Sequence, residues 1–222
     1  MPNPRNGSVS ATSTSGGRAE RFSSHRAFAA IWDQATKRES RAEQQLRREA
    51  AARVVGRVLE LGVGVGANWP YLAQTLEYEG VEPDIHMLRR ARRRAASMGR
   101  TLSLKRARAE ALPFEAETFD SVLGTFTLCT VQDPAGALSE VMRVLKPGGA
   151  LVFVEHVRPD GTVSGWLMDR VTPLWQRVAG GCQPNTKTAD TIVQAGFEIE
   201  TIDRRRANGL PMISGVARKA SS

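Results

Sequence analysis

Short apolar runs alternate with amphipathic segments along most of this 222-residue sequence. Seven stretches combine the length and the apolar content of strands: residues 56–63, 77–84, 101–107, 119–126, 150–157, 197–205 and 211–218. The stretch 150–157 is apolar until its acidic end, which is typical of a strand covered on both faces of a sheet. Because helical segments separate these strands, the pattern predicts a doubly wound α/β sheet.

Helical periodicity lies between the strands and before the first of them. Apolar side chains recur at i, i+3, i+4 and i+7 from Phe28 to Ala35, so we expect a helical segment from residue 25 to about residue 53. Asp84 can cap the helix that follows it, and a Pro-Gly-Gly stop ends the amphipathic stretch 133–149. Further helices are predicted over residues 67–76, 85–98, 163–181, with a break at Pro173, and 186–196.

The two ends of the chain differ in composition. Residues 1–23 are rich in Ser, Thr, Gly and Asn and carry few apolar side chains, so we expect a disordered tail. Residues 24–222 suffice for one domain with a buried core. No apolar run reaches the roughly 18 residues that a transmembrane helix needs, and we expect a cytoplasmic protein. Cys129 and Cys182 lie far apart without a pairing pattern, so we expect free thiols.

The formal net charge of +8 raises the question of an anionic partner. Much of the charge comes from arginines on predicted helices, and the charges in residues 38–53 alternate in sign at helical spacing. Such alternation is typical of a solvated helix face. We therefore favour background charge over binding to nucleic acid or to an anionic membrane, and peripheral contact with a membrane stays open.

The segment LELGVGVGAN, residues 59–68, carries the most specific chemistry in the chain. Gly62-x-Gly64-x-x-Ala67, with Glu82 about 20 residues on, matches the dinucleotide fingerprint, and the absence of a Gly-Lys-Ser/Thr ending excludes a P-loop. Glu60, at the end of the first predicted strand, would repel a diphosphate and attract an ammonium or a sulfonium. Residues 62–71 contain no Lys or Arg. The charge pattern thus favours S-adenosylmethionine over NAD.

The order and spacing of several segments resemble the class I S-adenosylmethionine-dependent methyltransferases, specifically the methyltransferase type 11 domain. The matching segments are VLELGVGVGAN, GVEPD, AEALPFEAETFDSV and ALSEVMRVLKPGGALVFVEHV. The resemblance implies a Rossmann-like, mostly parallel seven-stranded sheet with an antiparallel C-terminal strand and an extra N-terminal helix. It divides the domain into a helical cap (24–54), a cofactor-binding core (55–157) and a substrate-side half (158–222).

The C-terminal part of the chain carries a second, looser resemblance. The segments VTPLWQRVAGGCQPNTKT, AGFEIE and GLPMISGVARK resemble a bacterial subgroup related to methyltransferase-like thiol and alkyl methyltransferases. Some relatives of that subgroup are labelled phospholipid N-methyltransferases. This resemblance bears on the choice of acceptor only.

The family resemblance also implies roles for individual residues in S-adenosylmethionine binding. Glu60 and the three glycines would line the methionine portion, Glu82 would accept both ribose hydroxyls, and residues 109–110 would meet the adenine. Many relatives have an Asp at the position of Arg108. Trp32 belongs to an element that covers the cofactor in some relatives, with core packing as the alternative. The implied cofactor-binding residues are Glu60, Gly62, Gly64, Gly66, Asn68, Glu82, Pro83, Ala109, Glu110, Thr127 and Leu128.

Methyl transfer from a sulfonium needs an acceptor nucleophile placed in line, and it needs a general base only when the nucleophile arrives protonated. His156, at the end of the fifth predicted strand, is the candidate catalytic base, with a structural histidine as the alternative. We expect Cys129 to be a packing residue and Cys182 to lie in the substrate region. The sequence gives no reason to expect a metal site.

Four functions stay open at this point. The leading one is methylation of a small, apolar acceptor, because residues 158–185 are rich in aromatic and aliphatic side chains. The second is methylation of a phospholipid head group at a membrane surface, favoured by Arg170 and Arg177 in the same segment. The third, an RNA methyltransferase, lacks an Asn/Asp-Pro-Pro-Tyr/Phe tetrapeptide and an RNA-binding module. The fourth is a non-catalytic binding module. No obligate protein partner is expected.

Overall fold

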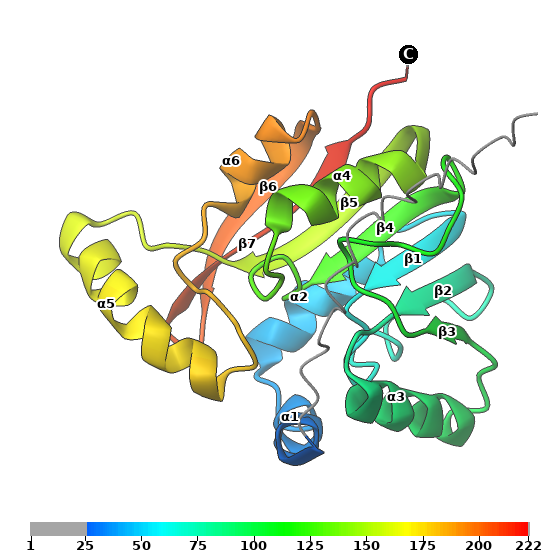
Figure 1. The fold of residues 1–222 in the computed structure, drawn as a ribbon, viewed down its shortest axis with the longest axis horizontal. Coiled ribbons are helices and arrows are strands. Elements are labelled where there is room, and N and C mark those ends of the chain that lie inside the picture. The colour runs from blue at the N-terminus through cyan, green and yellow to red at the C-terminus, as the bar shows by residue number, and fades with distance from the viewer. Residues whose placement is uncertain (1–25, 222) are drawn as a thin grey trace, which may run out of the picture.

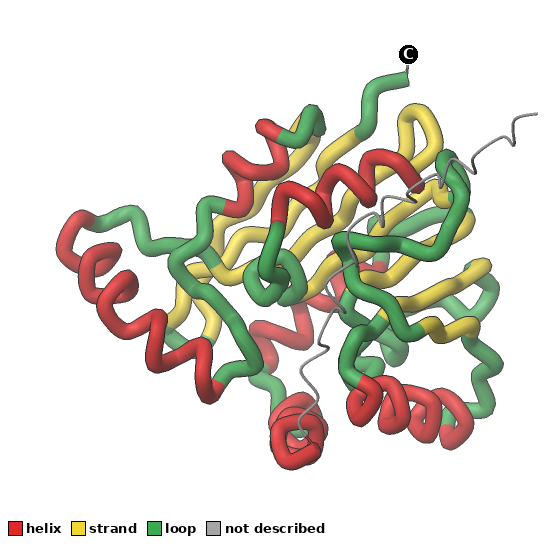
Figure 2. Tube along the Cα trace, viewed as in Figure 1, coloured by secondary structure: helices red, strands yellow, loops and turns green. Residues whose placement is uncertain are grey.

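Seven strands and six helices make up the part of the chain that the computed structural model describes, residues 26–221 (Figures 1 and 2). The predicted tail, residues 1–23, lies outside the described residues. The strands are β1 (Arg57–Leu61), β2 (Glu77–Val81), β3 (Ser103–Lys105), β4 (Phe119–Thr125), β5 (Leu145–His156), β6 (Glu198–Ala207) and β7 (Leu210–Arg218). The helices are α1 (Arg26–Thr36), α2 (Arg41–Ala51), α3 (Ile85–Ser97), α4 (Pro134–Val144), α5 (Thr162–Val178) and α6 (Thr188–Gln194).

All seven strands form one sheet in the order β3-β2-β1-β4-β5-β7-β6. The strands from β3 to β5 pair in parallel, and β7 pairs antiparallel with both β5 and β6. The predicted mostly parallel sheet with an antiparallel C-terminal strand is confirmed. The strand order reverses between β1 and β4, and doubly wound sheets bind their ligands outside the carboxyl ends of the strands at such a point.

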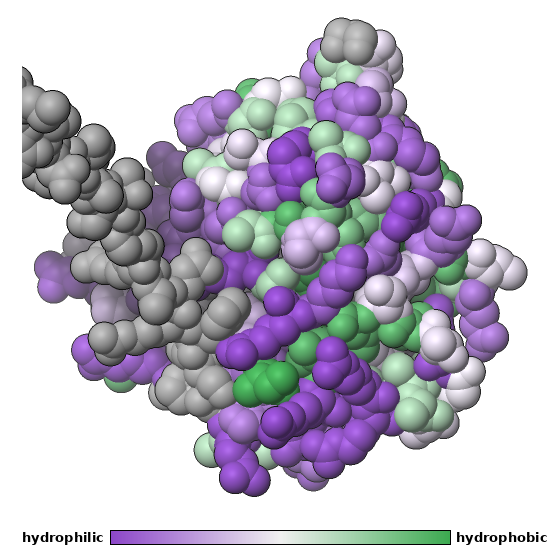
Figure 3. All heavy atoms as spheres, turned by 45° about the vertical axis from the view of Figure 1, so that its right-hand side comes forward, coloured by the Kyte–Doolittle hydropathy of each residue, from purple (hydrophilic) through white to green (hydrophobic). Residues whose placement is uncertain are grey.

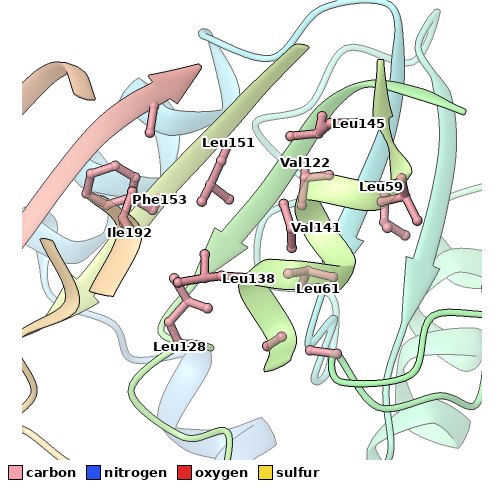
Figure 4. Close-up of a cluster of buried hydrophobic side chains, with 14 of the residues drawn as sticks. Leu59, Leu61, Val122, Leu128, Leu138, Val141, Leu145, Leu151, Phe153 and Ile192 are labelled. Carbon is pink, nitrogen blue, oxygen red and sulfur yellow. The ribbon is translucent and has the colours of Figure 1, made fainter. Parts of the chain in front are cut away.

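Helices cover both faces of the sheet. In the view of Figure 1, α4 and α6 lie in front of the strands and α2 lies behind them. Figure 4 shows part of the core between the sheet and α4, where Leu59, Val122 and Leu151 from the sheet face Leu138 and Val141 from the helix. All five are fully buried. The core holds the strands rigidly and so positions the loops at their carboxyl ends.

The predicted helix over residues 67–76 is wrong, because this segment forms a series of turns. Its polar groups make tertiary hydrogen bonds that a helix could not make. The Asn68 side chain turns inward to Glu60 at 2.8 Å, and the Arg100 guanidinium donates to the backbone carbonyls of Trp69 and Ala73. The indole of Trp69 is 1% exposed and belongs to the core. Burial of this residue outweighs local helix propensity.

Two other helix predictions need correction. The predicted segment 25–53 is divided into α1 and α2, because Ser40 and Glu43 form a capping box that starts a new helix. The predicted break at Pro173 is wrong, since α5 continues through it. Proline has no amide hydrogen for the carbonyl four residues earlier, so the helix lacks one backbone hydrogen bond there. The α5 helix lies at the outer side of the molecule, at the left in Figure 1.

The surface matches the interpretation of the arginines as solvated charge. In Figure 3, where the right-hand side of Figure 1 comes forward, hydrophilic residues predominate, and groups of apolar residues lie between them. The exposed face of α3 carries Arg89, Arg92 and Arg93, and its apolar face packs against the core of the sheet through Ala91 and Ala95. None of the helices within residues 26–221 is both long and apolar enough to cross a membrane.

Candidate functional site

A pocket of about 820 Å³ opens at the carboxyl ends of the parallel strands. Its walls come from the glycine loop after β1, from the ends of β2, β4 and β5, and from the loop that follows β3. Helix α1 and the segment after α5 complete the rim. The pocket therefore lies at the point where the strand order reverses.

Glu60, at the end of β1, lies at the base of this pocket and is 1% exposed. One carboxylate oxygen accepts a hydrogen bond from Asn68 Nδ2 at 2.8 Å, and the other accepts one from the Tyr78 hydroxyl. Trp69 Nε1 donates to that hydroxyl in turn, at 2.9 Å. Burial raises the pKa of Glu60, and the hydrogen bonds from Tyr78 and Asn68 oppose this shift. This chain of buried donors fixes the orientation of the carboxylate.

Arg47 also lines the pocket, and the sequence analysis missed it. Its guanidinium is buried, donates to Asn68 Oδ1 at 2.9 Å and to Thr125 Oγ1 at 2.7 Å, and pairs with Glu39 at 2.7 Å. Residues 62–71 contain no Lys or Arg, but Arg47 comes from α2. The predicted negative bias at the end of β1 is therefore incomplete, because this end of the pocket contains both a carboxylate and a guanidinium.

The three glycines of the loop are required for different structural reasons. All three adopt positive φ angles, of 59° at Gly62, 58° at Gly64 and 81° at Gly66. A Cβ at Gly62 would lie 2.8 Å from Thr127 Oγ1, and one at Gly66 would lie 2.5 Å from the ring of Trp69. A Cβ at Gly64 would meet nothing closer than 3.9 Å. Gly62 and Gly66 therefore serve packing, and Gly64 leaves the backbone open to a ligand.

Glu82 follows β2 and is 6% exposed in the pocket wall. One carboxylate oxygen accepts the amide hydrogen of Gly64 and the other that of Asp84, both at 2.8 Å. Burial raises the pKa of Glu82 to about 7, against the lowering effect of these two hydrogen bonds. The remaining lone pairs of such a carboxylate can accept hydrogen bonds from a ligand.

The loop after β3 forms another part of the wall. Ala107, Arg108, Ala109 and Glu110 all line the pocket. Arg108 forms an ion pair with Glu110 at 2.9 Å. The charge of the arginine is thus balanced within its own loop.

The floor of the pocket is organised by Glu155, which lies at the acidic end of the predicted strand 150–157 and is a sequence candidate for a residue near the chemistry. The carboxylate of Glu155 is fully buried and accepts the amide hydrogens of Thr127, Leu128 and Cys129, at 2.9–3.0 Å. Burial raises its pKa to about 7. An acid at the end of an apolar strand, facing the turn after the neighbouring strand, is the sequence signal that points to this role.

Apolar and polar side chains surround the opening beside His156. Its ring lies 4.9 Å from the Phe126 ring, and its Nδ1 is 3.6 Å from Cys182 Sγ. Phe28 and Trp32 of α1 stack at 5.7 Å and line the same pocket. This half of the pocket combines an aromatic wall with an imidazole and a thiol.

Most of the residues that the sequence singled out come together here. The predicted residues that line the pocket are Glu60, Gly62, Gly64, Glu82, Pro83, Ala109, Glu110, Thr127 and His156. Gly66, Asn68 and Leu128 lie behind the lining: Gly66 packs on Trp69, Asn68 bonds to Glu60, and Leu128 belongs to the core. These three residues support the wall.

Comparison with known proteins finds similarity to methyltransferases. Residues 59–153 match the family described as "Methyltransferase domain". The phosphatidylethanolamine N-methyltransferase of Cereibacter sphaeroides is 38% identical over 119 residues, which are 51% of this chain and 59% of that protein. The thiol S-methyltransferase TMT1B of Rattus norvegicus is 35% identical over 145 residues, which are 63% of this chain and 59% of that protein. The chain thus spans 59% of the length of each of these two relatives.

The fold has solved counterparts. The YcgJ protein of Bacillus subtilis matches with a TM-score of 0.65 and 19% identity, over 82% of this chain and 100% of that chain. At this identity the likeness shows the fold alone, and it agrees with the sheet described above.

Proposed function

We propose that this chain, whose residues 59–153 match a methyltransferase domain, transfers a methyl group from S-adenosylmethionine to a small acceptor with an apolar body. The match over residues 59–153 confirms the resemblance inferred from the sequence, and the domain implies S-adenosylmethionine as the methyl donor. The observation that carries the proposal is the presence of Glu60 and Arg47 together at one end of the pocket and the fixed carboxylate of Glu82 in its wall.

Glu60 and Arg47 suit the amino-acid end of S-adenosylmethionine. That end carries an ammonium and a carboxylate, which need opposite charges in the protein. Four of the five N–H donors of Arg47 go to Glu39, Asn68 and Thr125, which leaves one for the cofactor carboxylate. Glu60 supplies the negative charge for the ammonium.

Glu82 suits the ribose of the cofactor. Its two oxygens are already oriented by the amides of Gly64 and Asp84, and each has a further lone pair for a ribose hydroxyl. The open space at Gly64 lets the cofactor approach the backbone. A diphosphate in this position would lie against two carboxylates, Glu60 and Glu82, which disfavours NAD.

The reaction is a displacement at the methyl carbon of the sulfonium. The acceptor nucleophile forms the new bond to that carbon while the carbon–sulfur bond breaks and its electron pair stays on sulfur. The protein contributes placement in line and exclusion of water. The aromatic wall formed by Phe28, Trp32 and Phe126 would exclude water, and His156 would accept the proton of an acceptor that arrives protonated.

A methyl-transfer assay tests this proposal. The purified chain is incubated with S-adenosylmethionine labelled in the methyl group and with thiols, phenols, quinones or phospholipid vesicles in turn. We expect label in a product of at least one class, and Glu82→Gln should lower the rate much more than Glu77→Gln, an exposed position on the preceding strand β2. Failure of the wild type to bind S-adenosylmethionine and to label any of these acceptors would contradict the proposal.

A second candidate acceptor is a phospholipid head group, and helix α5 is the observation that favours it. Large apolar side chains are exposed along one face of this helix: Val163, Trp166, Leu167, Val171, Leu174 and Trp175, from 39% to 79% exposed. The guanidinium of Arg170 lies 4.8 Å from the ring centre of Trp166. An apolar face with a cation fits the boundary of an anionic membrane. One relative named above is a phosphatidylethanolamine N-methyltransferase.

Vesicle flotation separates the two acceptor classes. For a lipid acceptor, the chain should float with vesicles of phosphatidylethanolamine and an anionic lipid, and Leu167→Glu with Leu174→Glu should abolish flotation and lipid methylation together. If the wild type stays in solution with these vesicles, or methylates a water-soluble acceptor equally well after both changes, the lipid candidate is wrong and the small acceptor stands.

A further inference from the structure

Two cysteines and a histidine meet at the acceptor side of the pocket. Cys129 follows β4, His156 ends β5, and Cys182 follows α5, so three separate elements converge. The distances are 3.6 Å between the two sulfurs, 3.8 Å from Cys129 Sγ to His156 Nδ1 and 3.6 Å from Cys182 Sγ to the same nitrogen. We propose that these three side chains hold a zinc ion, whose fourth coordination position binds a thiol acceptor.

The three distances fit one face of a zinc tetrahedron. With Zn–S bonds of about 2.3 Å and a Zn–N bond of about 2.05 Å, tetrahedral angles separate two sulfurs by about 3.8 Å and sulfur from nitrogen by about 3.6 Å. Each of the three observed distances lies within about 0.2 Å of these values. The spacing of the three atoms is therefore that of three ligands of a single ion.

The surroundings hold the three ligands in place. The amide of Cys129 donates to the buried carboxylate of Glu155 at 3.0 Å. The Cys129 carbonyl accepts the amide hydrogen of Gln183, the residue after Cys182, at 2.7 Å, which ties the two cysteine-bearing segments together. The imidazole of His156 packs against an aromatic ring whose centre is 4.9 Å away. The ligands are therefore positioned before any metal binds, which lowers the cost of assembling the site.

The kind of ligand selects the kind of ion. Two sulfurs and one imidazole nitrogen suit zinc and are poor ligands for magnesium or calcium, which prefer oxygen. Among residues 26–221 no further Cys, His, Asp or Glu side chain joins this group. Three protein ligands with an open position are typical of zinc sites that act on a substrate. His156 and Cys182 line the pocket, so the open position faces the acceptor half.

The inferred chemistry rests on the proposed methyl transfer and specifies its acceptor. A thiol that binds zinc loses its proton to solvent and stays bound as a thiolate. The thiolate sulfur then forms a bond to the methyl carbon while the sulfonium–methyl bond breaks, which gives a methyl thioether and S-adenosylhomocysteine. One proton is released in each turnover, and no electron is gained or lost. In this arrangement His156 is a metal ligand, which replaces its role as a general base.

Metal analysis of the full chain tests the zinc site independently of activity. The chain is purified under reducing conditions with zinc in the growth medium, and its zinc content is measured together with calorimetric binding of S-adenosylhomocysteine. We expect one zinc per chain in the wild type and in His86→Asn, a control histidine outside the group. Cys182→Ser and His156→Asn should lose the zinc and keep S-adenosylhomocysteine binding. A wild type without zinc, or with a Cys129–Cys182 disulfide under these conditions, would overturn the inference.

Cobalt substitution tests the open position. Co²⁺ at this site should give a thiolate-to-cobalt absorption band, and thiophenol should change that spectrum in the wild type. An unchanged spectrum would overturn the part of the inference that concerns the acceptor. Zinc without S-adenosylhomocysteine binding would contradict the proposed function and leave the metal site standing. Thiol methylation by a zinc-free wild type would contradict the metal site and leave the proposed function standing.

Discussion

The amide of Gly64 donates to the carboxylate of Glu82 at 2.8 Å and so joins the glycine loop after β1 to the end of β2. This hydrogen bond orients an acid that is 18 positions away in sequence toward the loop where the cofactor is proposed to bind. The cofactor site therefore depends on two neighbouring strands being in register, which their parallel pairing ensures.

Glu82→Gln should weaken binding of S-adenosylmethionine by about 10–100-fold, because a hydrogen bond to a charged group contributes about 1.5–3 kcal/mol. The amide keeps the size of the side chain but offers only one acceptor oxygen. Calorimetric titration measures the change, with Glu77→Gln at the exposed start of β2 as the control. Equal affinities for Glu82→Gln and wild type would exclude a ribose contact.

The raised pKa of Glu82 predicts a pH dependence of stability in the chain without cofactor. Its pKa is about 7 in the folded chain against an ordinary 4.5, so the folded state binds the proton more tightly than the unfolded state. The contribution of Glu82 to the free energy of unfolding is then fully present below about pH 4.5. It is lost as the pH rises toward 7, and the loss is up to about 3 kcal/mol. In urea unfolding at a series of pH values, the free energy of unfolding should fall less steeply with rising pH in Glu82→Gln than in the wild type.

Arg47→Lys should weaken binding of S-adenosylmethionine by about tenfold or more and leave binding of 5′-methylthioadenosine unchanged, because the latter lacks the carboxylate. Lysine keeps the charge but cannot reproduce the contacts of the guanidinium with Glu39 and Thr125. Arg48→Lys, an exposed neighbour on α2, is the matched control. If Arg47→Lys weakens the binding of both ligands equally, Arg47 has only a structural role.

Alanine at two of the glycines should separate packing from ligand approach. Gly66→Ala places a Cβ 2.5 Å from the ring of Trp69, so it should lower the free energy of unfolding by more than the roughly 1–2 kcal/mol that a positive φ costs alone. Gly64→Ala should lower the free energy of unfolding only by the amount that a positive φ costs, and it should reduce the affinity for the cofactor. Thermal unfolding and calorimetry distinguish them, and a more stable Gly66→Ala than Gly64→Ala variant would contradict the assignment.

The sheet could be predicted from the sequence because its strands are local apolar runs with clear ends. The acids Glu60 and Glu82 were also predictable, since both lie at strand ends at fixed distances from the glycines. The helix predicted over residues 67–76 failed because tertiary hydrogen bonds from Arg100 and burial of Trp69 decide that segment. No local pattern carries such information.

Other parts of the site depend on contacts between distant segments. Arg47 lies on a helix whose alternating charges indicate a solvated face, and only the folded chain shows that its guanidinium points into the pocket. Cys129 and Cys182 are 53 positions apart, without the spacing of a metal motif, and the fold brings their sulfurs to 3.6 Å. Convergence of loops at the carboxyl ends of strands is a property of the fold as a whole.

The central claim is that the pocket over the glycine loop binds S-adenosylmethionine through Glu60, Arg47 and Glu82. Calorimetric titration of the full chain with S-adenosylmethionine, and separately with NADH, tests it most directly. We predict binding of S-adenosylmethionine at one site per chain, weakened in Glu60→Gln, and no binding of NADH. Binding of NADH with no response to S-adenosylmethionine would contradict the claim.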